Sequence, residues 1–597
     1  MALFDRASLV QIPSGYKEGK LYNIKPFDQP FEFERGSAAT RVNEDGLIET
    51  FYDEATNLLL QSNQFDTTWS QFNIDTPING FVGYDGSNEA WLINTTGDSM
   101  QMAQGTTDTG IKTFSVYAKA GNTNWLWLFA NNASFSQAYF NLSGDGSIGN
   151  TNGTLAENIE KIGDNGWYRC SITFTGSATS LRIVVAQDNG SLLTGADKNL
   201  YIQDAQLESG YFATPYIETT TEAVTRPNRH NTPRIDYTNG KSLLLEPQRT
   251  NLIAYSEDFG GYTNSNSTDT PNDTTSPEGV SNGTSFKEQA TTGQHKLVTA
   301  STFDGSSTYT FSIFAKYNGR DLFIDTQNSN EWEGRAWFDL SLGTANSVLG
   351  SASIEDYGDG WYRCIVTADS SLSGSNNVEL LTSDGSTNST TGDTTKGVYI
   401  YGAQLEQGSY ATSYIPTNGQ TETRLKDVCI GGGDESTFND SEGVLYAEIK
   451  FNESTYNHLS INDGTANNNV VIWSHSGNVV RTNVTSGGSY TLNFTTSVNS
   501  TDSFNKIAIK YKQNDFKVYI NGVSVHTDTS GNTPTGLNQI SFDNGSGGTT
   551  IFEGNVKALA YFPEALEDHQ LERLTSPTPL YASSFEDLAN NNGYTIL

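Results

Sequence analysis

The chain repeats itself at long range, and this repeat constrains its fold more than any other feature. The motifs Thr-Asn-Leu, Gly-Trp-Tyr-Arg-Cys and Ala-Gln-Leu-Glu each occur twice. Asn57 corresponds to Asn251, 194 residues later, and Gln206 corresponds to Gln404, 198 residues later. Solenoid and propeller repeats have periods of roughly 20–50 residues. The nearly constant separation therefore indicates two whole domains with small loop insertions, and it favours doubled binding or doubled spacing over a single-pocket enzyme.

The composition predicts an all-β fold. The chain has 597 residues, of which 11% are aromatic, and it contains 57 glycines. Disordered chains are poor in aromatic and β-branched residues, so this chain should fold. Short apolar runs alternate with clusters of Gly, Asn, Asp and Ser, as in sandwiches and barrels. At roughly 150 residues per domain, the length suggests about four domains.

The formal charge of −34 excludes several classes of partner. Nucleic acids and anionic membranes are bound through Lys and Arg, so neither is expected here. The N-terminal residues lack an apolar signal-peptide core, and the chain has no apolar run of about 18 residues. We therefore expect synthesis in a host cytoplasm without membrane insertion.

The three cysteines predict free thiols. Cys170 and Cys364 occupy equivalent places in the two repeats, and Cys429 stands alone. A disulfide framework normally shows more cysteines at short spacings, and no CxxC pair suggests zinc.

The pattern along the chain predicts seven segments. They are a leader (1–53), a first repeat (54–217), a linker (218–249), a second repeat (250–417), a short linker (418–437), a different β domain (438–575) and a tail (576–597). Expected strands in the first repeat are 114–118, 125–129, 139–142, 168–174 and 181–186, from their β-branched and aromatic content. In the leader, the segment 42–48 is a strand candidate. In the third domain, Asn521-Gly522 predicts a two-residue hairpin turn, and residues 564–574 predict a short helix.

The first linker is the one locally cationic stretch of this acidic chain. Arg226-Pro227-Asn228-Arg229-His230 carries its charge beside proline. An extended spacer is the simpler interpretation, because proline disfavours helix. The alternative is a dock for an acidic neighbouring subunit.

Two stretches resemble segments of tailed-bacteriophage structural proteins. They are Arg35-Gly36-Ser37-Ala38-Ala39-Thr40-Arg41-Val42-Asn43-Glu44-Asp45-Gly46-Leu47-Ile48-Glu49 and Ser242-Leu243-Leu244-Leu245-Glu246-Pro247-Gln248-Arg249-Thr250-Asn251-Leu252. In this chain a complete repeat separates them, which departs from the usual order. The two repeats resemble carbohydrate-binding-type jelly-roll domains of phage fibres, through Gly-Trp-Tyr-Arg-Cys and the segment 402–416.

The third domain is similar to concanavalin A-like, laminin-G-type sandwiches. The resemblance is carried by Lys517-Val518-Tyr519-Ile520-Asn521-Gly522-Val523 and by the closing segment 559–566. These resemblances imply a homotrimeric virion protein that attaches to other virion proteins through its leader and binds host surface polysaccharide. A fold alone does not name a ligand.

Tyr139 and Trp337 are the candidate glycan-binding residues. They stand one residue before Phe140 and Phe338 at equivalent places in the repeats. Because neighbours on a strand point to opposite faces, they face outward if the two phenylalanines face the core. An outward aromatic ring is a platform for sugar. The competing interpretation is a packed aromatic at a domain or subunit contact, where Tyr and Trp are also enriched.

The most repeated motif predicts a structural role. Trp167 and Trp361 are expected to be buried anchors with bonded N–H groups. Arg169 and Arg363 are expected to pair with Glu208 and Glu406.

No metal or cofactor is required by the sequence. Acidic loops such as 356–359 and Asp164-Asn165 could hold a structural Ca²⁺, but turn-forming Asp and Asn explain them equally well. No catalytic site is predicted either, since the chain has no GxSxG, HExxH or P-loop motif.

Three hypotheses follow. The first is a non-enzymatic fibre or spike subunit of a virion that binds host glycans. The second is a head fibre or capsid decoration protein with a mainly structural role. The third is a virion-borne glycan hydrolase, because two carboxylates can meet in space without a sequence motif.

Overall fold

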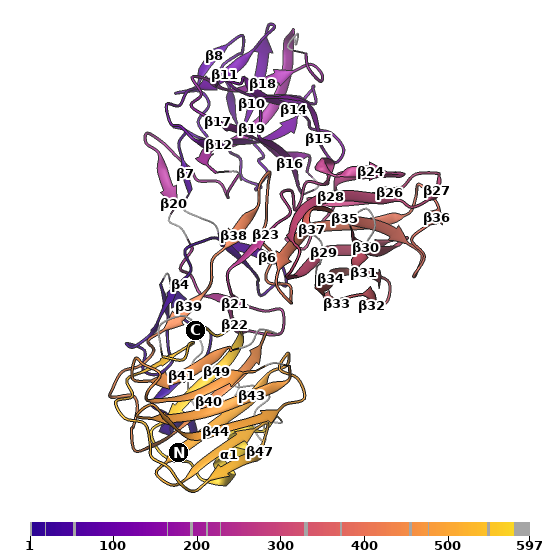
Figure 1. Ribbon diagram of the computed structural model, residues 1–597. Helices are drawn as coiled ribbons and strands as arrows, with labels where there is room; N and C mark the ends of the chain where they lie inside the picture. The colour runs from indigo at the N-terminus through magenta and orange to yellow at the C-terminus, as the bar shows by residue number, and fades with distance from the viewer. Residues whose placement is uncertain are drawn as a thin grey trace. The chain divides into compact units, whose positions relative to one another are not determined.

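The protein is built almost entirely from antiparallel strands, as its sequence predicts (Figure 1). The computed structural model describes residues 3–17, 19–51, 55–163, 165–191, 195–210, 213–226, 229–327, 332–369, 373–452, 456–475, 477–545 and 550–577. The predicted tail, 576–597, lies almost wholly outside these residues. The three described cysteines are buried and free, as expected. No helix in the described ranges is long and apolar enough to cross a membrane.

The chain divides into two compact units. The repeat unit contains residues 52–228 and 250–422, and the terminal unit contains 1–51, 229–249 and 423–597. The strands β23 (Arg249–Asn251) and β38 (Glu422–Arg424) span two points where the chain leaves one unit for the other.

The first repeat folds into a sandwich of two six-stranded sheets. Their strand orders are β16-β17-β12-β19-β10-β9 and β15-β14-β13-β18-β11-β8. The strands are β8 (Ser70–Phe72), β9 (Ile78–Phe81), β10 (Ala90–Thr96), β11 (Gln101–Gln104), β12 (Ile111–Ala120), β13 (Trp125–Ala130), β14 (Ser136–Asn141), β15 (Ser147–Asn152), β16 (Ala156–Ile162), β17 (Trp167–Thr175), β18 (Leu181–Ala186) and β19 (Ala196–Ser209). A short pair, β7 (Ala55–Asn57) and β20 (Val224–Arg226), accompanies it.

The second repeat has the same strand order. Its sheets are β33-β34-β29-β37-β26-β25 and β32-β31-β30-β35-β28-β24. The strands are β24 (Thr263–Ser265), β25 (Ser267–Thr274), β26 (Gly283–Glu288), β28 (Lys296–Asp304), β29 (Thr308–Asn318), β30 (Asp321–Gln327), β31 (Trp332–Asp339), β32 (Thr344–Leu349), β33 (Ser351–Asp356), β34 (Trp361–Asp369), β35 (Ser373–Ser383) and β37 (Gly397–Gln407), with a small pair of β27 (Thr292–Gly293) and β36 (Thr390–Thr391).

Alternation along the strands builds each core. In the first repeat, Phe114 and Val116 of β12 meet Leu126 and Leu128 of β13 in one fully buried cluster. Because successive side chains point to opposite faces, Trp127, between Leu126 and Leu128, lies on the outer face of the sheet. The candidate site is built on that outer face.

A buried asparagine explains why Thr-Asn-Leu recurs. The side-chain N–H₂ of Asn251 donates to the carbonyls of Ala403 (3.1 Å) and Ile415 (2.9 Å). Its Oδ1 accepts from the N–H groups of Ile253 and Leu405, both at 3.1 Å. Asn57 makes the equivalent four bonds in the first repeat. This side chain therefore ties the start of each repeat to its last strand and its closing segment.

The Gln-Leu-Glu segment closes each sandwich. Glu406 is fully buried and accepts from the N–H (2.6 Å) and hydroxyl (2.6 Å) of Thr412. Oε1 of Gln404 accepts from the N–H of Ile415 (2.6 Å). Gln206 and Glu208 bond the corresponding residues in the first repeat.

The terminal unit contains a third sandwich. Its larger sheet has the order β21-β22-β49-β40-β45-β46-β47 with β1 also on β49, and its smaller sheet has the order β44-β43-β42-β41-β48. The strands are β1 (Leu9–Gln11), β21 (Arg234–Asp236), β22 (Ser242–Leu245), β40 (Glu442–Phe451), β41 (His458–Asn462), β42 (Asn469–Ser474), β43 (Val479–Ser486), β44 (Ser489–Ser497), β45 (Asn505–Lys512), β46 (Phe516–Ile520), β47 (Val523–Asp528), β48 (Gln539–Ser541) and β49 (Gly554–Phe562).

The residues that we predicted as a leader and a linker contribute to this unit. β1 and β22 both pair with β49, and Phe31 and Phe33 are buried in the core of the sandwich. A small sheet joins β2 (Tyr16–Lys17), β3 (Lys20–Leu21), β4 (Phe31–Glu34) and β39 (Val428–Ile430). The predicted strand at 42–48 is instead mostly the turn of a hairpin between β5 (Ala39–Val42) and β6 (Ile48–Phe51), because Asn43 Oδ1 caps the turn by accepting from two N–H groups.

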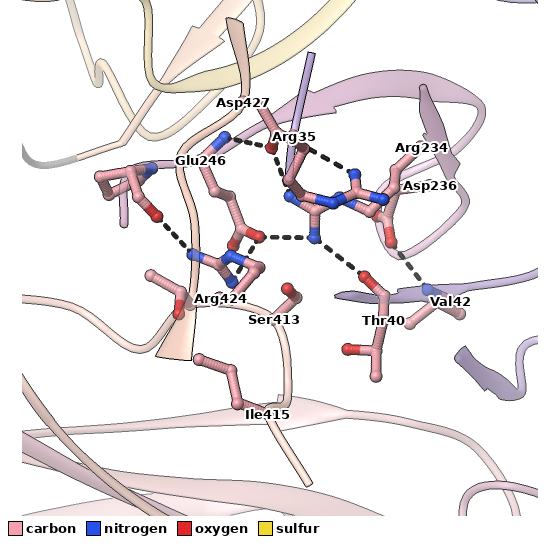
Figure 2. A network of polar contacts seen from close by, with 12 residues as sticks. Arg35, Thr40, Val42, Arg234, Asp236, Glu246, Ser413, Ile415, Arg424 and Asp427 are labelled. Atoms are coloured by element: carbon pink, nitrogen blue, oxygen red, sulfur yellow. Dashed lines mark hydrogen bonds and ion pairs between the residues drawn. The ribbon is translucent and has the colours of Figure 1, made fainter. Parts of the chain in front are cut away.

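A buried ionic network joins three segments of the terminal unit, around residues 35, 234–246 and 424–427 (Figure 2). Asp427 accepts from the guanidinium groups of Arg35 (3.1 Å) and Arg234 (2.5 Å). Glu246 accepts from Arg234 (2.7 Å) and Arg424 (2.8 Å). All five side chains are at most 4% exposed. Arg35, Arg234 with Glu246, and Arg424 with Asp427 come from segments far apart in the sequence, so the network specifies how those segments meet.

Backbone groups complete the network. The N–H of Glu246 donates to Asp427 (2.9 Å), and Arg234 donates to the carbonyl of Thr40 (2.9 Å). Burial, opposed by Asp427, lowers the pKa of Arg35 to about 10, so this guanidinium stays charged at neutral pH. The segments 35–49 and 242–252 thus supply Arg35 and Glu246 to one structural centre.

Two local predictions for the third sandwich are confirmed. Asn521 (φ 49°) and Gly522 (φ 84°) both have positive φ between β46 and β47, as a type I′ turn requires. The predicted helix is α1 (Asp568–Thr575), and its side chains Leu571 and Leu574 are buried. The only other described helices are the 3-10 turns η1 (Leu3–Arg6) and η2 (Phe259–Gly261).

Candidate functional site

A row of aromatic rings crosses the outer face of the β13–β14 sheet in the first repeat. Trp127 and Tyr139 are cross-strand partners, and their rings stack at 5.6 Å with an interplanar angle of 15°. Phe129 lies 5.1 Å from Trp127, and Phe135 continues the row 6.4 Å beyond Phe129. The indole N–H of Trp127 donates to Oε1 of Gln137 (3.1 Å), which fixes the orientation of the ring.

An arginine lies beside this aromatic row. Arg182 is the cross-strand partner of Phe129, and its guanidinium lies 4.9 Å from the centre of that ring. Its Nε donates to the hydroxyl of Ser180 (3.2 Å). Burial lowers the pKa of Arg182, and no ion pair to it occurs among the described residues. The face therefore combines flat rings with a cation and an amide, the groups that contact sugar rings, carboxylates and hydroxyls.

The rings differ sharply in exposure. Tyr139 is only 4% exposed and Trp127 7%, whereas Phe135 is 58% exposed. Burial and the charge of Asp188 raise the pKa of Tyr139, which stays neutral. A ligand on this face would meet Phe135 and the edges of the other rings rather than a fully open platform.

The second repeat places Trp337 at the position that corresponds to Tyr139. Trp337 pairs across strands with Phe323, and it is half-buried, on the face opposite the buried Phe338. Phe323 pairs in turn with Leu381. The two candidate residues from the sequence thus lie on equivalent faces, each in its own sandwich, and the structure does not bring them into one site.

The neighbouring row on this face carries ionisable side chains in the second repeat. Asp325 corresponds to Phe129 by register and lies 3.3 Å from Arg335, whose guanidinium also lies 5.2 Å from the ring of Phe323. Glu379 accepts from Lys296 (2.8 Å). Asp325 is fully buried, and neither of its carboxylate oxygens has a hydrogen-bond partner among the described residues. The two equivalent faces therefore share aromatic rings but differ in charge.

The buried Asp325 should make the stability of the second repeat depend on pH. Burial raises its pKa to about 8, despite the opposing effect of Arg335. Its pKa in an unfolded chain is about 3.9. Because its pKa is raised in the folded state, Asp325 contributes its full share to the free energy of unfolding below about pH 4. This contribution is lost as the pH rises to about 8. We expect the second repeat to unfold at progressively lower denaturant concentration between pH 5 and pH 8.

The Asp325→Asn variant tests this origin of the pH dependence. An uncharged amide of the same shape should reduce the dependence of the denaturation midpoint between pH 5 and pH 8. The part that remains is expected from Glu278 of the same repeat, whose pKa burial also raises to about 8. The exposed Asp384→Asn variant serves as the control and should retain it. An unchanged pH profile in Asp325→Asn would show that another group is responsible.

The Gly-Trp-Tyr-Arg-Cys motif lies on the opposite sheet. In β17, Tyr168 and Cys170 belong to the core of the sandwich, so Trp167 and Arg169 lie on the outer face. Trp167 is 1% exposed and packs with Tyr117 in a small cluster of its own. Arg169 donates to the carbonyls of Ala213 (3.2 Å) and Thr214 (2.6 Å).

The second copy of the motif is similar. The indole N–H of Trp361 donates to the carbonyl of Thr275 (3.0 Å). Arg363 donates to the hydroxyl of Ser312 (3.0 Å), and its guanidinium lies 5.4 Å from the ring of Phe314. The predicted pairs of Arg169 with Glu208 and of Arg363 with Glu406 are not direct contacts, and each glutamate affects its arginine only through its charge. Both carboxylates accept hydrogen bonds from the closing segments of their repeats instead.

The acidic loops are organised as turns. Oδ1 of Asp356 accepts from the N–H of Gly358 (2.8 Å), as in an Asx turn. Asp164 lies outside the described residues. The described ranges contain no group of three or more His, Cys, Asp or Glu side chains arranged to hold a metal ion.

Sequence reasoning missed most residues of the aromatic face. Trp127, Phe129 and Arg182 became evident only through their cross-strand pairing with the strand of Tyr139 and with each other. The alternation Trp125-Leu126-Trp127-Leu128 was the available signal, because it places one large ring after another on the face opposite the leucines.

Comparison with solved structures gives likenesses of low similarity. No family model matches the chain, and no curated protein matches it. Among solved structures, the Ruminococcus gnavus IT-sialidase CBM40 bound to alpha2,3 sialyllactose aligns with 17% sequence identity and a TM-score of 0.21. The alignment covers 25% of this chain and 94% of that one.

Proposed function

We propose that this protein is a non-enzymatic fibre subunit of a phage virion that binds glycans on the host surface. The observation that carries the proposal is the stacked Trp127–Tyr139 pair beside Arg182, with Trp337 and Phe323 at the equivalent place in the second repeat. Aromatic faces pack against the apolar side of sugar rings, and polar groups beside them bind hydroxyls.

The duplication itself supports a binding role. Two equivalent faces in one chain, multiplied by assembly into a homotrimer, would raise apparent affinity without any new contact, because later binding events become intramolecular. The different charges of the two faces fit different parts of one heteropolymer. Attachment to other virion proteins through the N-terminal residues completes this proposal.

The structural alternative is a head fibre or decoration protein. The low exposure of Tyr139 and Trp127 favours it, because rings that are already packed offer less area to a ligand. In that case Phe135 and Trp337 would contact other subunits of the virion instead of glycan.

One experiment separates these functions. The purified full-length protein is incubated with the extracted surface polysaccharide of the host, and saturable binding and new reducing ends are measured together. The proposal predicts binding without reducing ends. New reducing ends would contradict the non-enzymatic assignment, and the absence of binding would favour the structural alternative.

A further inference from the structure

A second polar face with a central aromatic cluster lies on the terminal unit. It is the outer face of the five-stranded sheet β44-β43-β42-β41-β48. Leu459, Ile461, Val470 and Ile472 face the core, so the residues that alternate with them point outward. One outward row, which crosses four strands, consists of His458, Trp473, Arg481 and Thr495.

Trp473 is the centre of this row. The ring of His458 stacks on it at 5.0 Å with an angle of 10°, and Tyr456 stacks at 5.7 Å and 15°. The guanidinium of Arg481 lies 4.6 Å from the centre of the indole on the next strand. Trp473 is 8% exposed and Tyr456 is 54% exposed. The cluster thus presents Tyr456 and the partly exposed His458 and Arg481 to solvent.

Side-chain amides fix the tryptophan and the arginine. The indole N–H of Trp473 donates to Oδ1 of Asn483, whose own N–H₂ donates to Oδ1 of Asn493 (2.9 Å). A terminal N–H₂ of Arg481 donates to the same Asn493 oxygen (3.0 Å). Such a chain of bonds holds both side chains in one orientation before any ligand arrives. Preorganisation of this kind reduces the entropic cost of binding.

The cation in this face is not neutralised by a carboxylate. Among the described residues Arg481 makes no ion pair, and its Nε is buried without a hydrogen-bond partner. Within the strands, the other outward rows contain Ser, Val, Asn, Gln, Thr and Tyr but no Asp or Glu. This absence is unusual in a chain whose formal charge is −34. The carboxylate of Asp543, just after β48, acts on His458 by its charge. A planar guanidinium with free donors matches a carboxylate in a bidentate manner.

We propose that this face binds an acidic glycan. Arg481 pairs with the carboxylate of a hexuronic or nonulosonic acid residue, and Tyr456 and the Trp473 cluster contact the sugar ring. The site is independent of the repeat faces, because all of its residues belong to the terminal unit.

The test uses the full-length chain carrying Tyr139→Ala and Trp337→Ala, so that the repeat faces are altered in every sample. Oligogalacturonate, alginate, hyaluronan and polysialic acid are immobilised, each beside its carboxyl-reduced form. We expect binding to at least one acidic polymer and at least ten-fold weaker binding after carboxyl reduction. Binding of equal strength to a reduced form, or to none of the polymers, would overturn the proposal.

Variants assign the binding to this face. Arg481→Gln and Tyr456→Ala should each weaken it at least ten-fold, and Tyr456 is exposed enough for its truncation to leave the fold intact. Lys512→Gln, which removes one positive charge from the other sheet of the same sandwich, is the matched control and should bind as the parent does. If Lys512→Gln lost as much binding as Arg481→Gln, or if the protein bound dextran sulfate as strongly as the acidic glycans, general charge attraction would explain the binding. Either result would contradict the proposed site.

Discussion

Replacing Asp427 by Asn is expected to destabilise the terminal unit by about 3–5 kcal/mol. Asp427 is one of two carboxylates that face three buried guanidinium groups, and it also accepts from the N–H of Glu246. Removing its charge leaves Arg35 without its ionic partner and Arg234 with Glu246 alone. A buried charge that loses its partner keeps its desolvation cost, and this is the physical reason for the large effect.

The measurement should report on the terminal unit alone, since a chain with several sandwiches does not unfold in one step. Hydrogen exchange of peptides from β40 and β49 provides that readout, with peptides from β12 as the internal reference. Glu32→Gln is the control, because its pair with Lys20 is exposed and should be worth less than about 1 kcal/mol. Equal protection in Asp427→Asn and Glu32→Gln would contradict the structural role of the network.

The Asn251→Ala variant is expected to destabilise the second repeat by at least about 3 kcal/mol. The change removes four buried hydrogen bonds at once and leaves two N–H groups and two carbonyls of the main chain without partners. Asn57→Ala should have a similar effect on the first repeat alone, because its four bonds are equivalent. Hydrogen exchange of β37 and β19 peptides distinguishes the two repeats.

Asn264→Ala is the control for this prediction. Asn264 is an exposed asparagine of the same repeat, whose amide bonds Asp269. Its truncation should cost less than about 1 kcal/mol. A loss of protection in Asn251→Ala no larger than that of Asn264→Ala would mean that the Thr-Asn-Leu motif recurs for a reason other than closure of the sandwich.

The sequence predicted the fold where apolar alternation is strong. The strand expected at 181–186 is β18 itself, and 125–129 falls within β13. Polar edge strands such as β15, with the sequence Ser-Ile-Gly-Asn-Thr-Asn, were not predicted, because a solvated edge needs no apolar pattern. The membership of residues 1–51 in the terminal unit could not be predicted either, since it depends on the pairing of β1 with β49 and of β4 with β39, which lie far away in the sequence.

The candidate site was predictable only in part. Alternation placed Tyr139 on the face opposite Phe140, but the packing of Trp127 against it depends on strand register, which one sequence does not specify. The same limit applies to Arg481 and Trp473, which are cross-strand partners eight residues apart. Residues that act across a sheet become visible as a group only when the register is known.

The central claim is that the outer faces of the two repeats bind glycan, and the most direct measurement is the binding of variants to host surface polysaccharide. Phe135→Ala, Arg182→Gln and Trp337→Ala alter exposed or half-buried residues of these faces. Tyr317→Ala, an exposed ring on the other sheet of the second repeat, is the control. We predict that combining the three face variants weakens binding at least ten-fold while Tyr317→Ala binds like the unchanged protein. Unchanged binding by the combined variant, with its fold intact, would contradict the claim.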